Sequence, residues 1–200
     1  YADAILTELG GPSLIDAGFA WAWWLVLYAI FVALNSAGAE ASFTFAIVVA
    51  VMSVAILALF GIVAVASGSV DLASLWDIAP TTGDSAFLPF GVAPILFAMP
   101  FAMWLFLGIE ELPLAAEEAH NPERDIPRAG RWGMITLILT GAVVVVLNPA
   151  VLGSTTAGGA DAPLLDGFSA MIPGNIAAIL SAFALVGLLA SVQGIMFAAG

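Results

Sequence analysis

The sequence predicts an all-α integral membrane protein, and three observations lead to this fold class. Hydrophobic residues make up 62% of the 200 positions, whereas a soluble globular domain is about 45–50% apolar. Charged residues make up only 9%, too few to cover a water-exposed surface. The 3 basic and 15 acidic side chains are clustered, which leaves uncharged stretches at 17–39, 41–70, 85–109, 132–160 and 167–200.

Each of these stretches is long enough for one membrane helix, because crossing the hydrocarbon core takes about 20 apolar residues. We predict helices at roughly 19–35, 42–66, 88–119 (interrupted), 132–150 and 175–199. The first begins with Trp21, Trp23 and Trp24, which suit an outer aromatic belt. The second is an apolar run that follows a short turn at 35–40.

The third predicted helix is too long for a simple span. If continuous from 88 to 119, it would measure about 48 Å, whereas the hydrocarbon core is about 30 Å thick. Gly108 favours a local loss of helix, and Pro113 removes a backbone donor. A hydrophobic segment broken by Gly and Pro is typical of a transporter binding site, because the unwound backbone offers N–H and C=O groups to a ligand.

The carboxylates of this segment have two interpretations. Hydropathy alone would end the span near Leu107 and leave Glu110 and Glu111 solvated at the membrane interface. An interrupted helix that continues would instead hold them in the membrane interior, where an ionisable group usually has a function. Glu117 and Glu118 are expected at the interface in either case. The residues alone leave this choice open.

The fourth predicted helix follows the chain's only basic residues. Arg124, Arg128 and Arg131 lie in the segment 121–131, which we expect to be a loop on the cytoplasmic side by the positive-inside rule. The acidic segments 67–84 and 153–166 and the N-terminus would then face outside.

The last predicted helix carries a stripe of small residues at spacings of 3, 4, 3 and 4, namely Ala184, Gly187, Ser191, Gly194 and Ala198. Such a face lets another helix approach closely, and packing is its ordinary role. Apart from Asn175 at the start of this span, Gln193 is its one amide. It either lines a pathway or bonds to a neighbouring helix.

Composition also excludes several function classes. A net charge of −12 with no lysine speaks against nucleic-acid binding and against a polybasic patch for anionic lipid. Without cysteine, this chain has no thiol nucleophile and no zinc–thiolate site. Its single histidine, His120, is not part of a metal motif, and no cofactor is expected. An intramembrane enzyme and a non-transporting membrane scaffold remain the alternatives to a transporter.

Several motifs resemble those of the amino acid–polyamine–organocation permeases. Gly108-x-Glu110, continuing through Ala116-Glu117-Glu118-x-x-Asn121-Pro122-x-Arg124-x-Ile126-Pro127-Arg128, is similar to the signature of their sixth helix and the following cytoplasmic loop. Asn35-x-x-Gly38-x-x-x-Ser42 resembles their turn between helices four and five, and the run 185–191 resembles their helix eight. With Pro89-Phe90-Gly91 and Asn148-Pro149-Ala150, the chain is most similar to the ethanolamine permease branch.

This resemblance implies a partial five-plus-five inverted-repeat transporter fold with a broken helix. Residues 1–200 would be an incomplete transmembrane permease domain of about five spanning helices, corresponding to helices four to eight of the family. The implied function is secondary active transport of a small amine-bearing solute, such as ethanolamine or an amino acid, across the cytoplasmic (inner) membrane by alternating access. A coupling proton or cation is a further expected partner.

The expected substrate-binding residues surround the interruption of the third predicted helix, together with the amide of the last one: Trp104, Leu107, Gly108, Ile109, Glu110, Glu111 and Gln193. In the family an aromatic residue near the position of Trp104 often closes the substrate site. Two departures bear on the mechanism. Many proton-coupled relatives carry a lysine in helix five, which this chain lacks, and Glu111 stands where the family usually has a small residue.

Overall fold

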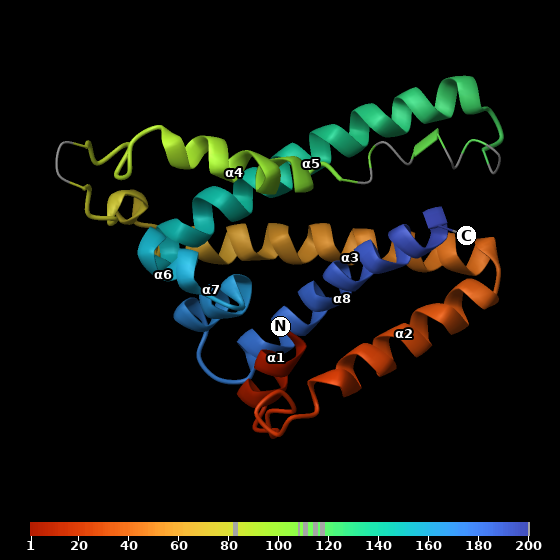
Figure 1. Cartoon of the computed structure of the whole chain (residues 1–200), viewed down its shortest axis with the longest axis horizontal. Coiled ribbons are helices and arrows are strands. Elements are labelled where there is room, and N and C mark those ends of the chain that lie inside the picture. Colours follow the sequence, from red (N-terminus) through yellow and green to blue (C-terminus); the bar gives the residue numbers. More distant parts are fainter. Residues whose placement is uncertain (82–83, 108, 110–111, 114–115, 117–118, 200) are drawn as a thin grey trace. The chain divides into compact units, whose positions relative to one another are not determined.

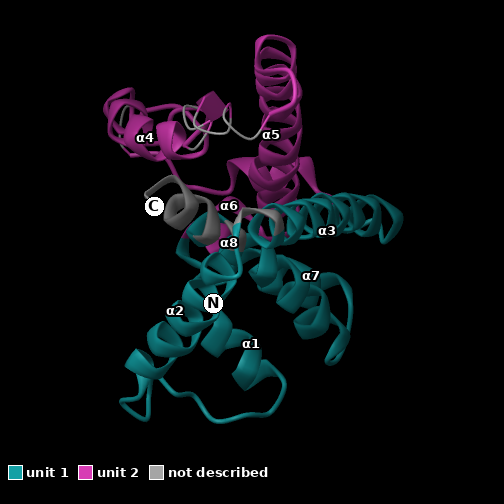
Figure 2. Cartoon of the chain, turned by 90° about the vertical axis from the view of Figure 1, so that its right-hand side faces the viewer, with its two compact units in different colours: residues 1–69, 159–200 teal, residues 70–158 magenta. Residues whose placement is uncertain are grey.

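The structure, a computed structural model, is built almost entirely from helices (Figure 1). It describes residues 1–81, 84–107, 109, 112–113, 116 and 119–199, with the backbone alone at 39–40, 190 and 193–199. Over these residues there is no strand, only an isolated bridge between Ser85 and Leu88. The prediction of an all-α membrane protein is confirmed. The chain divides into two compact units, residues 1–69 with 159–200 and residues 70–158 (Figure 2).

The first unit is organised around its last helix. It contains α1 (Ala2–Glu8), α2 (Ala20–Ser36), α3 (Ala39–Ala66), α7 (Pro163–Met171) and α8 (Ile176–Ala199). Helix α8 lies between α3 and α2 (Figure 1) and also contacts α1 and α7. Phe60 of α3 and Phe168 of α7 are both fully buried and meet edge to face, with ring centroids 5.1 Å apart. Aromatic pairs prefer this geometry, which adds to the burial of their area.

The small-residue stripe of α8 meets α3 at Gly187. A Cβ at Gly187 would collide with Ser53 Oγ and would lie 2.9 Å from Ser53 Cβ, so only glycine fits at this distance. The packing interpretation is confirmed at this position. Ser191, one turn further along the stripe, is exposed, and Gly194 and Ala198 are described by their backbone alone.

The second unit contains η1 (Leu72–Trp76), α4 (Ala93–Trp104), α5 (Pro122–Leu152) and α6 (Ser154–Gly159). Hydrogen bonds join η1 and the residues on either side of it to the end of α5 and the start of α6. Asp71 N donates to Ala150 O at 2.9 Å, and Ser154 Oγ donates to Leu75 O at 3.0 Å. Asp77 Oδ1 accepts from the backbone N–H of Thr155 at 3.0 Å and from its hydroxyl at 3.2 Å.

By length and composition, two helices of the described chain could cross a membrane, namely Ala41–Ala66 of α3 and the whole of α5. Helix α2, helix α4 and the part Ile176–Leu189 of α8 are apolar but shorter. The helices predicted at 19–35, 42–66, 132–150 and 175–199 are all present, with ends that differ by a few residues except at the start of α5.

The segment 121–131 is not a loop, and this expectation was wrong. Helix α5 begins at Pro122 and runs without a break for 31 residues. Proline suits the first turn of a helix, where its missing N–H would have no partner. Glu123 and Asp125 also lie in the first turn, where carboxylates interact favourably with the helix dipole. The charged residues at 123–131 therefore do not prevent the helix from forming.

Candidate functional site

The candidate site begins where α4 ends. This helix runs from Ala93 to Trp104, with Pro94 in its first turn, and none of its residues is buried among the described residues. Its 12 residues reach about 18 Å at 1.5 Å per residue. That is little more than half of the hydrocarbon core, which is about 30 Å thick. Helix α4 alone is therefore too short to cross a membrane.

The backbone changes its hydrogen-bonding pattern directly after Trp104. Phe106 N donates to Met103 O at 3.0 Å, Leu107 N to Trp104 O at 3.1 Å, and Ile109 N to Phe106 O at 3.4 Å. These bonds span three residues, as in a 3₁₀ turn, which is frequent where an α-helix ends. Of the helix predicted at 88–119, the described residues are thus α-helical only at Ala93–Trp104, and the loss of α-helix begins at Leu105, three positions before Gly108.

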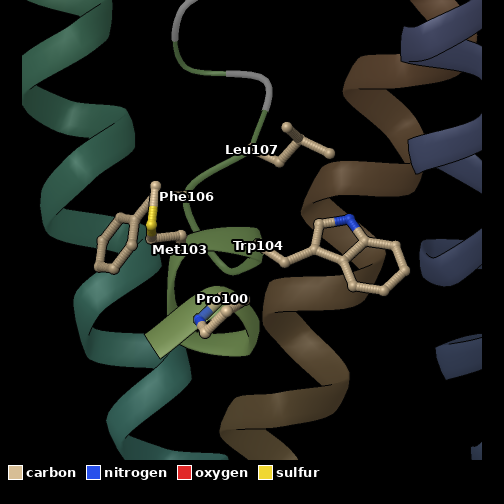
Figure 3. A pocket seen from close by; sticks show the side chains of 5 residues that line it. All are labelled: Pro100, Met103, Trp104, Phe106 and Leu107. Atoms are coloured by element: carbon tan, nitrogen blue, oxygen red, sulfur yellow. The ribbon is translucent and has the colours of Figure 1, made fainter. Parts of the chain in front are cut away.

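Five side chains around this helix end line an open depression of about 430 Å³ (Figure 3), namely Pro100, Met103, Trp104, Phe106 and Leu107. Trp104 is 69% exposed and Leu107 is 53% exposed. Among these five described side chains, the indole N–H is the only polar group. Chemically, the depression suits an apolar group, and the exposed indole ring also offers a face that attracts a cation.

Helix α5 supports the turn from one side. A Cβ at Gly141 would lie 3.1 Å from Leu105 Cδ2, so the glycine lets Leu105 pack closely on α5. Met103 and Phe106 lie on the α5 side of the turn, whereas Trp104 and Leu107 point away from α5 (Figure 3). The turn therefore presents Trp104 and Leu107 on the side that α5 does not cover.

Of the predicted substrate-binding residues, the structure brings Trp104 and Leu107 together and places Ile109, half-buried, directly after them. Gly108, Glu110 and Glu111 lie outside the described residues. Gln193 lies in α8, in the other unit, and its side chain is likewise not described. Among the residues that the structure describes, no group of three or more His, Asp or Glu side chains could hold a metal ion.

The predicted site residues did not include Pro100, Met103 and Phe106, which also line the depression. The first two could have been found from their spacing. Pro100, Met103, Trp104 and Leu107 follow the i, i+3, i+4, i+7 pattern of one helix face. Phe106 breaks that pattern because it belongs to the turn.

Comparison with known proteins decides the family. The model of the amino acid permease family matches residues 7–200. The chain belongs to the amino acid permease family. The general resemblance in its motifs is thereby confirmed, and the permease is part of a transporter family.

Individual relatives of the permease are only moderately similar. An uncharacterised transporter of Rhizobium meliloti is 33% identical over 144 residues, which are 71% of this chain and 30% of that protein. The aromatic amino acid transport protein AroP of Escherichia coli O6:H1 is 30% identical over 115 residues, 54% of this chain and 24% of AroP. The L-methionine/branched-chain amino acid exporter YjeH of Escherichia coli is 38% identical over 68 residues, 33% of this chain and 16% of YjeH.

The aligned part of the permease thus spans less than a third of each of these relatives. No solved structure gave a significant match. The relatives named here are transporters, so the alternative of an intramembrane enzyme finds no support among them.

Proposed function

We propose that the full-length permease is a secondary active transporter in the cytoplasmic membrane and moves a small amine-bearing solute by alternating access. The observation that carries this proposal is the end of α4 at Trp104, where an apolar span stops after 12 residues and continues in 3₁₀ bonds. Non-helical backbone at membrane depth is tolerated only where it is buried in protein or lines a water-filled cavity.

The two glutamates after the turn, without a basic side chain nearby in the sequence, support a cationic substrate. Glu110 and Glu111 follow the turn directly, and a carboxylate in the membrane interior costs about 2.5–3.5 kcal/mol on insertion scales unless it has a partner. The basic side chains of this chain begin only at Arg124, in α5. A substrate ammonium group would supply the missing partner, and the exposed face of Trp104 could attract the same cation.

The lining of the depression favours an amino acid with an apolar side chain. All five lining side chains are largely apolar, and the names of the relatives AroP and YjeH refer to aromatic and to methionine and branched-chain amino acids. In this arrangement the substrate side chain would contact Trp104 and Leu107, and its ammonium group would meet the glutamates and the backbone carbonyls of the unwound segment.

Ethanolamine is the second candidate substrate. It is favoured by the resemblance of Pro89-Phe90-Gly91 and Asn148-Pro149-Ala150 to the ethanolamine permeases. It also has no carboxylate, and the segment between Trp104 and Asn121 has no lysine or arginine that would hold one.

Uptake into proteoliposomes by the full-length permease tests the proposal. Labelled phenylalanine, leucine, methionine and ethanolamine would be compared for the wild type and for Glu110→Gln, Glu111→Gln and Gly108→Leu. We expect Glu110→Gln to abolish transport. Glu111→Gln should weaken substrate affinity about tenfold or more, the cost of a lost hydrogen bond to a charged group. Gly108→Leu should block transport, because its side chain would fill the unwound segment.

Asp161→Asn is the matched control, since Asp161 is exposed and lies outside the predicted spans. It should transport like the wild type. If both glutamine variants also transport at the wild-type rate and affinity, the two carboxylates are solvated interfacial groups and the proposed site is wrong. Uptake of ethanolamine without uptake of the amino acids would select the second candidate.

A further inference from the structure

The start of α5 gathers every basic side chain of the 200 residues on one helix face. Arg124, Arg128 and Arg131 are spaced by four and three residues within α5. At 3.6 residues per turn, this spacing places them within an arc of about 60°. All three are exposed. A loop at 121–131 would have had no such face, so the arrangement follows from the helix.

These arginines have no anionic partner among the described residues. No ion pair joins them to a carboxylate in the part of the chain that the structure describes. Glu123 and Asp125 lie about 100° to either side of Arg124, in the first turn, where they interact with the helix dipole. Cations at the N-terminal end of a helix gain nothing from that dipole. Within the described part of the chain, all three guanidinium groups are therefore exposed and unpaired.

The depth of the arginines matches the headgroup region of a bilayer. The part of α5 from Trp132 to Leu152 is about 31 Å long, the thickness of a hydrocarbon core. Arg131 then lies at the edge of the core, and Arg124 lies about 10 Å further out. Arginine and phosphate form paired, charge-assisted hydrogen bonds, and the guanidinium group is only weakly hydrated.

The arginine face continues into an exposed apolar face on the same side of α5. Ile135 and Ile138 lie within about 40° of the direction of Arg124, and Leu139 within about 60°. Ile138 is 51% exposed and Leu139 62%. Trp132, at the junction of the two faces, is 62% exposed, and tryptophan favours the membrane interface.

We propose that Arg124, Arg128 and Arg131 bind the phosphate groups of anionic phospholipids in the leaflet at this end of α5, with the acyl chains along Ile135, Ile138 and Leu139. A count of basic residues alone speaks against such a site, because lipid-binding patches usually hold four to eight. Here only three arginines are present, but α5 places all three on one face, so they can act on the same lipid headgroups. Each arginine near the surface should contribute roughly fivefold to lipid affinity.

Lipid binding to the purified full-length permease tests the proposal without any transport assay. Phosphatidylglycerol and phosphatidylcholine would be titrated against the detergent-solubilised protein, and bound lipid would be counted by native mass spectrometry. We expect tighter binding of phosphatidylglycerol. Each Arg→Gln variant should lower that preference about fivefold, and the triple variant should remove it. Higher salt should weaken it as well, since exposed charges are screened.

Three control variants test whether the positive charge of the arginine face causes the preference for phosphatidylglycerol. Glu123→Gln and Asp125→Asn, on the flanks of the same turn, should keep or slightly raise the preference. Replacement of all three arginines by lysine should keep most of it, because the charge remains. If the triple glutamine variant retains the preference, the proposal is wrong.

The proposal also fails if inorganic phosphate competes fully with the lipid, since the site would then take a free anion. The proposal is also wrong if the glutamine variants lose the same stability in phosphatidylglycerol and in phosphatidylcholine. The arginines would then pair with another part of the protein. If the triple variant does not fold, the three single variants decide.

Discussion

Asp3 shows how one side chain can connect two helices at the N-terminal end of the described chain. Its buried carboxylate, in α1, accepts hydrogen bonds from Ser13 Oγ at 2.6 Å, from Leu14 N at 2.8 Å and from Trp23 Nε1 of α2 at 3.1 Å. The bond from Ser13 contributes most to holding the pKa of Asp3 below its ordinary value. Trp23 and Leu14 add to this effect, and burial opposes it.

The lowered pKa of Asp3 predicts how stability depends on pH. Because the folded state favours the carboxylate, this contribution is fully present above the unfolded pKa of about 4 and is lost as the pH falls through the lower folded pKa. Asp3→Asn should therefore lower the melting temperature at pH 7, and the difference from the wild type should shrink below about pH 4.

Thermal unfolding in detergent, followed by circular dichroism between pH 3 and pH 7, would measure this effect. Asp16→Asn is the control, because Asp16 is exposed and close in sequence. It should change the melting temperature little at any pH. A difference for Asp3→Asn that stays constant down to pH 3 would show that the ionised carboxylate contributes nothing of its own.

The position of single residues was predictable from the sequence only where their neighbours along the chain determine it. Trp104 and Leu107 were expected close together because they adjoin the predicted break, and both line the depression. Their role in substrate binding stays a prediction. Trp23 was grouped with Trp21 and Trp24 as an aromatic belt, yet its N–H bonds to Asp3. That bond joins residues 20 positions apart, and no local pattern in the sequence indicates it.

At the scale of elements, the sequence located the helices but not all of their ends. Uncharged stretches predicted α2, α3 and α8 to within a few residues, because hydropathy determines which segments enter a membrane. Hydropathy does not report where a helix stops. Helix α5 extends ten residues into the charged segment that begins at Pro122, whereas the apolar segment of α4 stops being helical at Trp104.

The contact between α3 and α8 gives a prediction at this scale. Gly187→Ala would place a methyl group against Ser53 and should destabilise the protein by roughly 1–3 kcal/mol through overpacking. Gly133→Ala in α5 is the matched control, since a Cβ there would have no neighbour within 4 Å. In a helix that substitution should be neutral or should stabilise by up to about 1 kcal/mol.

A second substitution can separate overpacking from other effects. Ser53 Oγ donates to Val49 O within its own helix at 2.8 Å. Removing this hydroxyl should therefore cost less stability than placing the Cβ of Gly187→Ala against Ser53. Adding Ser53→Gly to Gly187→Ala should recover part of the lost stability, measured by thermal unfolding in one detergent. Equal effects of Gly187→Ala and Gly133→Ala would contradict a tight contact.

At the scale of the whole molecule, a membrane-crossing α5 would place the segments at its two ends on opposite sides of the membrane. Glu123 lies in its first turn, and Thr156 lies four residues beyond its end at Leu152. The whole of α5 has 31 residues, which is about 46 Å. The arginines near Glu123 predict that this end is cytoplasmic.

Cysteine labelling checks this topology, because the 200 residues contain no cysteine. Any cysteine elsewhere in the full-length permease would first be replaced. Thr156→Cys should react with an impermeant thiol reagent in intact cells, and Glu123→Cys should react only after the membrane is opened. If only Glu123→Cys is labelled in intact cells, the orientation of α5 is the opposite of the one predicted. If both variants are labelled, α5 does not cross the membrane.

The central place of α8 in its unit has a consequence for the exchange of backbone hydrogens with solvent. Amides in elements with many packed contacts exchange only through large, costly openings, whereas sparsely packed elements open locally. Helix α8 is in contact with α1, α2, α3 and α7, and α4 has no buried residue among those described. In one detergent, deuterium should therefore enter α4 and the turn after Trp104 first, and the amides around Gly187 last.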